Sequence, residues 1–291
     1  MELNEIYIRD PFIFVEDDIL YLIGSTDEQP WSGKASGFLG YKSKDLKNFE
    51  GPFSLFENDG NFWSDENYWA PEMHKIDGKY CIFASFFAQG HHRSSQVLFS
   101  DKPFGKYVPS LKPFTPKDWD CLDATYYEEN GHRYTVFCHE YLQTIDGEMC
   151  LGEFNEDLTE LLSVKTLFKA SDAKWSVGFP LGNHPQMCFV TDGPFIYRMK
   201  SGRLLMLWSS NGAKGYTLGL AYSDNGIMGD WKQIDKPLYA DDGGHGMIFE
   251  FKNTKYLIIH INNKQFGHER AKLFKVIENN NAISLEELKE E

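Results

Sequence analysis

The chain has few cations, few cysteines and no long hydrophobic run, and each shortage excludes a class of protein. Its 291 residues carry 29 Lys and Arg against 43 Asp and Glu, which gives a formal net charge of -14. This charge repels nucleic-acid phosphates and anionic membranes, so a neutral partner such as a sugar suits the chain better. No apolar run approaches the ~18 residues of a membrane-spanning helix. The sequence therefore indicates neither nucleic-acid nor membrane binding.

None of the five cysteines belongs to a CxxC pair, which speaks against a zinc or redox motif. Their odd number favours reduced thiols in a protein core over disulfides, as in cytosolic proteins. The first residues, MELNEIYIRD, lack the charged n-region and apolar h-region of a secretory signal. We therefore expect a cytoplasmic protein.

The chain does contain a repeated pattern. Five segments begin with small or polar residues, continue with a β-branched or aromatic run, turn at polar residues and end in a second apolar run. Each segment has the pattern of a β-hairpin. The segments cover residues 9–26, 70–86, 122–140, 191–210 and 244–260.

The spacing of these hairpins predicts the architecture. The repeat of about 50–70 residues is too long for a hairpin alone and suits four short strands with loops. Further strand-like segments that end in charged turns follow the hairpins, as in residues 38–52 and 218–231. We predict an all-β chain that folds as a five-bladed β-propeller with four-stranded blades around a central axis. One catalytic domain would span residues 1–291, with blades beginning near 9, 70, 122, 191 and 244.

A propeller would bring distant residues together at the starts of its inner strands. These strands line the axis and run in the same direction, so their first residues gather at one end of the channel. The alternative is a β-sandwich with acidic turn residues scattered over its surface, but here the acids recur at one fixed place before a strand. The residues expected to be neighbours are Asp10, Glu72, Asp123, Asp192 and His245.

Five short motifs in chain order resemble the blade starts of glycoside hydrolase family 43. They are RDPFIF, WAPEMHKIDGKYCIFAS, CLDATYY, TDGPF and GGHGMIF. The resemblance covers nearly the whole chain. It implies an inverting, exo-acting glycoside hydrolase that acts on β-xylosides or α-L-arabinofuranosides of short oligosaccharides.

The resemblance also implies roles for three carboxylates. Asp10 would be the general base, Asp123 would modulate a neighbouring pKa, and Asp192 would be the general acid. The family usually has glutamate at the acid position, and an aspartate carboxyl lies about 1.5 Å further back. This departure keeps open a non-catalytic carbohydrate-binding propeller, and each of the three acids also has a purely structural interpretation as a turn or strand-start residue.

The expected chemistry follows from two carboxyl groups on opposite sides of one glycosidic bond. In inverting enzymes they stand about 6.5–9.5 Å apart, which leaves room for a water molecule. Ionised Asp10 would take a proton from that water, and protonated Asp192 would donate one to the leaving oxygen. A charged Asp123 would raise the pKa of Asp192 by like-charge repulsion.

The sequence also suggests substrate and metal contacts. Trp69, Glu72, His139 and Glu140 are predicted to bind substrate, although Glu72 also suits a supporting place behind the site and the His139-Glu140 pair also suits hydrogen bonds between blades. The resemblance implies a calcium ion on the axis at His245. Because calcium prefers oxygen ligands, the alternative is a histidine that hydrogen-bonds the carboxylates without metal. No organic cofactor is expected.

Three other activities share this architecture. An endo-1,5-α-L-arabinanase would need an open groove, and a galactosidase is also compatible with the resemblance. Invertase-like enzymes use a retaining mechanism with a Glu-Cys pair, and the chain contains no Glu-Cys dipeptide. The sequence leaves open the sugar, the oligomeric state and the way in which the ring closes.

Overall fold

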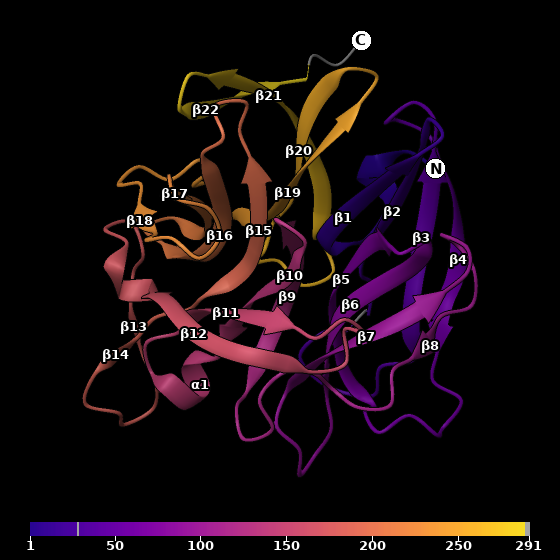
Figure 1. Ribbon diagram of the computed structural model, residues 1–291, viewed down its shortest axis with the longest axis horizontal. Helices are drawn as coiled ribbons and strands as arrows, with labels where there is room; N and C mark the ends of the chain where they lie inside the picture. Colours follow the sequence, from indigo (N-terminus) through magenta and orange to yellow (C-terminus); the bar gives the residue numbers. More distant parts are fainter. Residues whose placement is uncertain (28, 289–291) are drawn as a thin grey trace.

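The computed structural model describes residues 1–27 and 29–288. Within these residues the strands form five four-stranded antiparallel sheets and one two-stranded ribbon. The inner strands β1, β5, β9, β15 and β19 surround the centre of Figure 1, and the remaining strands of each sheet follow outward. The predicted five-bladed β-propeller is therefore confirmed.

The blades take their strands in chain order from the axis outward. Blade 1 has β1 (Arg9–Glu16), β2 (Ile19–Ser25), β3 (Gly37–Ser43) and β4 (Phe49–Glu57). Blade 2 has β5 (Glu66–Ile76), β6 (Lys79–Phe87), β7 (Ser94–Ser100) and β8 (Val108–Pro109). Blade 3 has β9 (Cys121–Glu129), β10 (His132–His139), β11 (Glu148–Phe154) and β12 (Leu161–Lys169). Blade 4 has β15 (Asp192–Arg198), β16 (Leu204–Gly212), β17 (Gly215–Ser223) and β18 (Lys232–Gln233). Blade 5 has β19 (Gly243–Phe251), β20 (Thr254–Ile261), β21 (Arg270–Asn279) and β22 (Ala282–Glu287).

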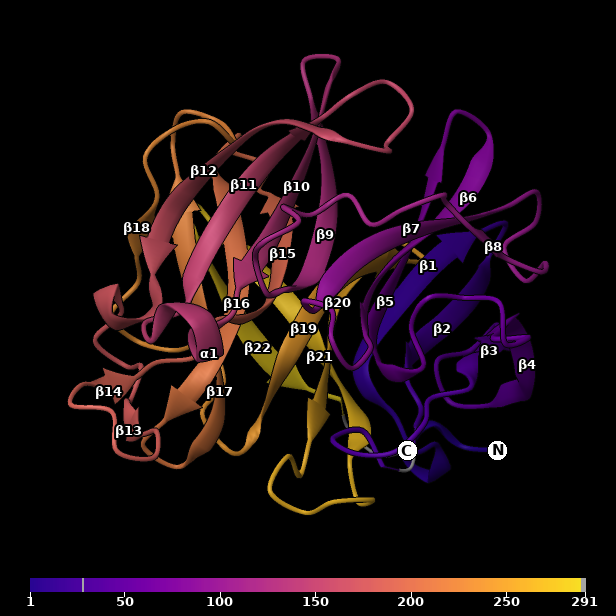
Figure 2. The same ribbon diagram turned by 90° about the horizontal axis from the view of Figure 1, so that it is seen from below.

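The connection between blades 3 and 4 carries extra structure. It contains the single-turn helix η2 (Ala170–Asp172) and the ribbon β13 (Phe179–Pro180) and β14 (Met187–Cys188). Figure 2 shows this ribbon beside α1 (Tyr141–Thr144), which follows β10. The Tyr141 and Phe179 rings pack edge to face with centroids 5.4 Å apart. The two insertions therefore build one rim of the propeller together.

The inner hairpins turn where the sequence has polar pairs. The β5–β6 turn has φ of 50° at Asp77 and 79° at Gly78. A two-residue turn with two positive φ values matches the right-handed twist of the flanking strands. The turns at Asp17-Asp18 and Asn130-Gly131 have the same signature. Because these turns depend on local residue preferences, the hairpins can be predicted from the sequence.

The hydrophobic core lies between neighbouring blades. One cluster joins Phe83 of blade 2 to Phe137 of blade 3, and another joins Leu207 of blade 4 to Leu257 of blade 5. Burial of such a side chain stabilises the fold by about 1.5–3 kcal/mol. All five cysteines are free and buried, as expected from the sequence. The inter-blade packing holds the inner strand starts at one end of the axis.

The ring closes by contacts between the first residues of the chain and blade 5. Strand β22 is the outer strand of blade 5, so each blade is built from one continuous segment. Tyr7 forms an isolated antiparallel bridge with Arg270 of β21. A buried ion pair of 2.8 Å between Arg9 Nη1 and Glu269 Oε1 ties the same two regions. In the described residues, no helix is long and apolar enough to cross a membrane.

Candidate active site

A backbone irregularity sets the position of the candidate catalytic side chains. The residue near the start of each inner strand has a left-handed conformation, with φ of 49° at Asp10, 55° at Asp123 and 49° at His245. Ala70 and Gly193 take this place in blades 2 and 4, with φ of 46° and 49°. Such backbone costs energy for residues other than glycine and is concentrated at functional sites. In each blade the pairing of the inner strand with the second strand also shifts register at this place, which marks a β-bulge, and such bulges re-aim side chains next to active sites.

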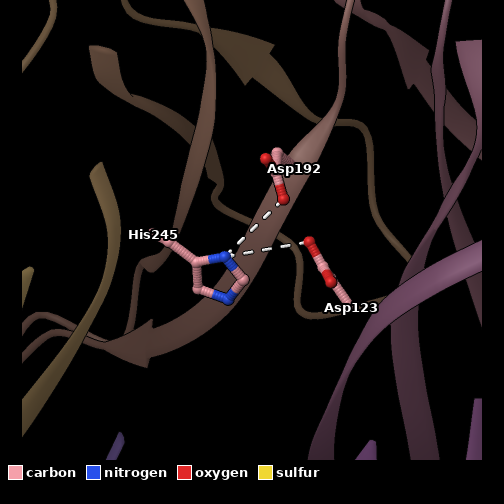
Figure 3. Close-up of side chains that lie close together, drawn as sticks. All are labelled: Asp123, Asp192 and His245. Carbon is pink, nitrogen blue, oxygen red and sulfur yellow. Dashed lines mark ion pairs between the residues drawn. The ribbon is translucent and has the colours of Figure 1, made fainter. Parts of the chain in front are cut away.

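Four residues that are far apart in the sequence meet at this end of the channel. The His245 Nδ1 atom lies 3.1 Å from Asp10 Oδ1, 3.6 Å from Asp192 Oδ1 and 3.8 Å from Asp123 Oδ2. Figure 3 shows one nitrogen of the imidazole facing both Asp123 and Asp192. The side chain of Asp192 is 24% exposed, whereas that of Asp123 is only 4% exposed. Asp192 is therefore the more accessible member of this pair.

Asp10 is held as a carboxylate. Burial opposes its charge, but the His245 and Arg9 cations hold the pKa of Asp10 well below its ordinary value. Ser25 Oγ donates a hydrogen bond of 2.5 Å to Asp10 Oδ2. The Asp10 backbone N–H donates to His260 Nδ1 at 3.0 Å. The first contact holds the carboxylate itself, and the second holds the backbone that carries it.

His260 is a neutral imidazole with a defined tautomer. Burial lowers the pKa of His260 to about 4. Its Nδ1 accepts the Asp10 N–H, so the proton sits on Nε2, which faces Asn263 Oδ1 at 3.1 Å. The Tyr216 ring stacks on this imidazole with centroids 5.2 Å apart.

Asp123 and Asp192 share one proton. Burial and the neighbouring Asp192 charge raise the pKa of Asp123 well above its ordinary value. Burial opposes the charge of Asp192, but hydrogen bonds from Asp123 and His245 lower its pKa. In the free protein the proton therefore rests on Asp123. The Gly193 backbone N–H donates to Asp123 Oδ2 at 3.1 Å and opposes this placement, because it stabilises the ionised form of Asp123.

His245 is a buried imidazolium. Burial opposes its charge, but the Asp10 carboxylate and the singly charged Asp123–Asp192 pair raise the pKa of His245 well above its ordinary value. Its backbone N–H donates to Ser209 Oγ at 2.8 Å. A Cβ on Gly193 would lie 2.7 Å from the His245 ring, so only glycine permits this approach. The ring brings positive charge to the centre of three carboxyl groups.

A pocket of about 170 Å³ opens above this cluster. Asp10, Asp123 and Asp192 line it together with Trp31 and Trp69. The two indoles pack edge to face at 5.0 Å. Aromatic walls over carboxylates suit a sugar ring, which offers an apolar face and several hydroxyls.

Two arginines contact the rings of the aromatic wall. The Arg93 guanidinium lies 4.1 Å from the centroid of Trp69, and Arg9 lies 4.9 Å from that of Trp31. Arg93 Nε also pairs with Glu140 Oε2 at 3.3 Å. These cation–π contacts fix the ring planes that face the pocket.

The structure places the four predicted substrate contacts differently. Trp69 and Glu140 line the pocket. Glu72 lies along a separate cavity of about 10 Å³ beside Asp10 and His245, and its Oε2 is 3.1 Å from His74 Nε2. His139 stacks on Trp119 at 4.1 Å and hydrogen-bonds Gln143. Glu72 and His139 therefore lie outside the pocket lining.

A calcium ion fits these residues poorly. Asp123, Asp192 and His245 each place one donor atom within 4.8 Å of the others. However, this set supplies one nitrogen and two carboxylate oxygens, whereas calcium takes about six to eight oxygen ligands. The cavity of about 10 Å³ on the Glu72 side holds roughly one water molecule. The geometry favours the metal-free alternative, in which His245 itself supplies the positive charge.

Sequence reasoning missed several residues that line the pocket. Tyr216 belongs to β17, the third strand of blade 4, and no repeated motif marks that position. Its hydroxyl is buried without a hydrogen-bond partner, and burial raises its pKa well above the ordinary value. The hydroxyl lies beside the carboxyl groups of Asp192, Asp10 and Asp123. Asn211 and Asn263 also line the pocket and come from strand ends that carry no motif.

Comparisons with known proteins agree with this geometry. The chain is similar to an endo-arabinase from Bacteroides thetaiotaomicron, with 33% identity, 96% of this chain and 97% of that chain covered, and a TM-score of 0.88. An α-L-arabinofuranosidase from Lactobacillus brevis shares the fold, with 17% identity, 96% and 93% coverage and a TM-score of 0.76. Alpha-L-arabinofuranosidase 43 from Humicola insolens is 24% identical over 192 residues, which are 60% of this chain. The chain covers only 36% of the length of that curated relative.

The family model of glycosyl hydrolases family 43 matches residues 5–278. This match covers nearly all of the propeller and contains all four members of the acidic cluster. The chain therefore belongs to glycosyl hydrolases family 43 and is a glycoside hydrolase that acts on carbohydrate.

Proposed function

We propose that the protein is an inverting, exo-acting hydrolase of α-L-arabinofuranosyl linkages in short oligosaccharides. One observation carries the proposal: Asp10 and Asp192 both lie beside His245 and both line one small aromatic-walled pocket. A volume of about 170 Å³ suits a terminal sugar better than the middle of a polymer. Arabinosides are preferred over β-xylosides because two of the similar proteins carry arabinose in their names.

The proposed reaction is a single displacement. Asp10 takes a proton from water while the water oxygen bonds to the anomeric carbon. The bond from that carbon to the leaving oxygen breaks, and Asp192 gives this oxygen its proton. The proton shared with Asp123 must first rest on Asp192, which the Gly193 N–H on Asp123 favours. Ionised Asp123 then disfavours loss of the proton from Asp192 before the bond breaks.

The carboxyl separation supplies a constraint on this proposal. Asp10 Oδ1 and Asp192 Oδ1 lie 3.1 and 3.6 Å from the same nitrogen, so they lie at most near the lower end of the ~6.5–9.5 Å range for inversion. A sugar ring and a water molecule need more room. We propose that substrate entry separates Asp192 from His245 and opens this gap.

The experiment combines a substrate panel with a stereochemical readout. Nitrophenyl α-L-arabinofuranoside, β-D-xyloside and galactoside are offered to the wild type and to Asp10→Ala, with arabino-oligosaccharides as natural substrates. We expect the arabinofuranoside to be cleaved fastest, and proton NMR of the first product to show the inverted anomer. A retained anomer would show that Asp10 is not the general base. Faster cleavage of the xyloside than of the arabinofuranoside would assign the enzyme to β-xylosides instead.

An endo-arabinanase is the second candidate, favoured by the name of the relative with 33% identity. Debranched arabinan separates the two. The exo-acting enzyme releases arabinose from the first time point, whereas an endo-acting enzyme releases a ladder of oligosaccharides.

A further inference from the structure

The bulged starts of the inner strands also share a hydrogen bond to the preceding blade. In four blades the left-handed residue donates its backbone N–H to a side chain on the second strand of the preceding blade. Ala70 donates to Ser25 Oγ, Asp123 to Ser85 Oγ and His245 to Ser209 Oγ, each at 2.8 Å. Asp10 donates to His260 Nδ1 at 3.0 Å across the closure of the ring.

The acceptors occupy one repeated position of the fold. Ser25 pairs with Arg9, Ser85 with Trp69, Ser209 with Asp192 and His260 with Gly244, in each case at the residue before the bulge. In blade 3 the corresponding pair is Leu122 and Cys138. The position that holds oxygen or nitrogen in the other blades therefore holds sulfur here.

Cys138 is a poor acceptor for the next backbone amide. Its side chain is fully buried, and burial raises the pKa of its thiol well above the ordinary value, so the group stays neutral. A neutral thiol accepts hydrogen bonds weakly. By the pattern of the other blades, the backbone N–H of Gly193 in blade 4 would donate to the Cys138 sulfur. This N–H donates to Asp123 Oδ2 at 3.1 Å instead.

We propose that Cys138 is a positioning residue that leaves the Gly193 N–H free to hold the Asp123 carboxylate. The inference rests on the proposed function, in which Asp192 is the acid and Asp123 its modulator. A hydrogen bond to an ionised acceptor is stronger than one to a neutral acceptor, so the amide favours the state with charged Asp123 and protonated Asp192. That state is the one able to protonate a leaving group.

Two substitutions of the same residue test the proposal. Cys138→Ser restores an oxygen acceptor, draws the Gly193 amide away from Asp123 and makes the productive state, with the shared proton on Asp192, less populated than in the wild type. We expect kcat on arabino-oligosaccharides to fall roughly tenfold, the size of effect expected from a hydrogen bond to a charged group, with little change in KM. Cys138→Ala removes the sulfur without adding an acceptor and should stay within about twofold of wild type.

The pH profile separates this role from simple packing. In Cys138→Ser the Gly193 amide no longer stabilises the doubly ionised Asp123–Asp192 pair. The pair therefore releases its last proton at a higher pH, and the basic limb of the kcat profile moves to higher pH. Cys138→Ala keeps the wild-type limb. Equal profiles and equal kcat losses in the two variants would overturn the proposal.

A second readout does not depend on activity. In protein labelled with ¹⁵N-glycine, the Gly193 amide resonance should follow the titration of Asp123 in the wild type and in Cys138→Ala. The resonance is assigned through the loss of this pH dependence in Asp123→Asn. A wild-type Gly193 resonance that ignores pH would also overturn the inference, even if Cys138→Ser failed to fold. A wild type without hydrolytic activity would count against the proposed function alone.

Discussion

Removing the carboxyl of Asp192 should abolish acid catalysis without weakening the fold. The charges around His245 explain why. In the wild type Asp10 is ionised, His245 is a cation, and Asp123 and Asp192 share one proton. In Asp192→Ala burial still raises the pKa of Asp123, but the repulsion from Asp192 disappears while the attraction of His245 remains, so we expect Asp123 to ionise in its place. The net charge of the cluster is then unchanged.

The expected size of each effect follows from this count. A positioned general acid contributes about 10²–10⁴-fold to the rate. We expect that loss on arabino-oligosaccharides, whose leaving oxygen needs a proton, and less than about tenfold on a nitrophenyl arabinofuranoside, whose leaving group does not. The melting temperature should change by no more than about 2–4 °C, because we expect the free energy of unfolding to change by about 1 kcal/mol or less.

Asp10→Ala is the matched comparison. It leaves the buried His245 cation without the partner at 3.1 Å, and breaking a buried pair costs about 3–5 kcal/mol. This variant should lose activity on both substrates and should also melt well below the wild type. The assays are initial rates by chromatography and by release of nitrophenol, with melting followed by circular dichroism. Equal rate losses for Asp192→Ala on the two substrates, or a melting loss as large as that of Asp10→Ala, would refute the reasoning.

Three further predictions follow from the same cluster. Tyr216→Phe should lower kcat/KM on arabino-oligosaccharides about tenfold without lowering the melting temperature, since its hydroxyl has no partner in the free protein; an unchanged kcat/KM would show that substrate does not use this donor. Dialysis against chelator should leave activity and melting unchanged because His245 carries the positive charge, and a loss restored by calcium would reinstate the metal. The raised pKa of His245 contributes stability fully below about pH 6.5, and this contribution falls as pH rises toward the folded pKa. Urea unfolding should therefore show a decline from pH 6.5 to 9 that His245→Gln reduces, and equal slopes in both proteins would contradict the pKa shift.

The hairpins, and with them the blades, were predictable because their signals are local. Asp77-Gly78 and Asn130-Gly131 need only their own φ preferences to form tight turns between apolar runs. The start of β5 was the least exact point. It begins at Glu66 rather than near residue 70, because the bulge that interrupts its pairing near Trp69 lies inside the strand.

The acidic cluster was also predictable, although for another reason. Because the motifs repeat once per blade, they occupy corresponding positions in the fold. Corresponding positions of the blades of a propeller lie together at one end of its axis. Asp10, Asp123, Asp192 and His245 do meet there. Glu72 belongs to the same series, yet it faces the small cavity beside His245 instead of the pocket.

The sequence by itself thus determined the blade hairpins, the number of strands per blade and which acids surround the axis, because turn chemistry and apolar runs mark each hairpin and the same motif recurs at regular spacing. Only the tertiary structure decided where protons and partners lie: Tyr216 in the pocket wall, His260 beneath Asp10, and a sulfur where the other blades place an acceptor. Those relations cross from one blade to the next. They depend on the register and packing of segments that no local pattern connects.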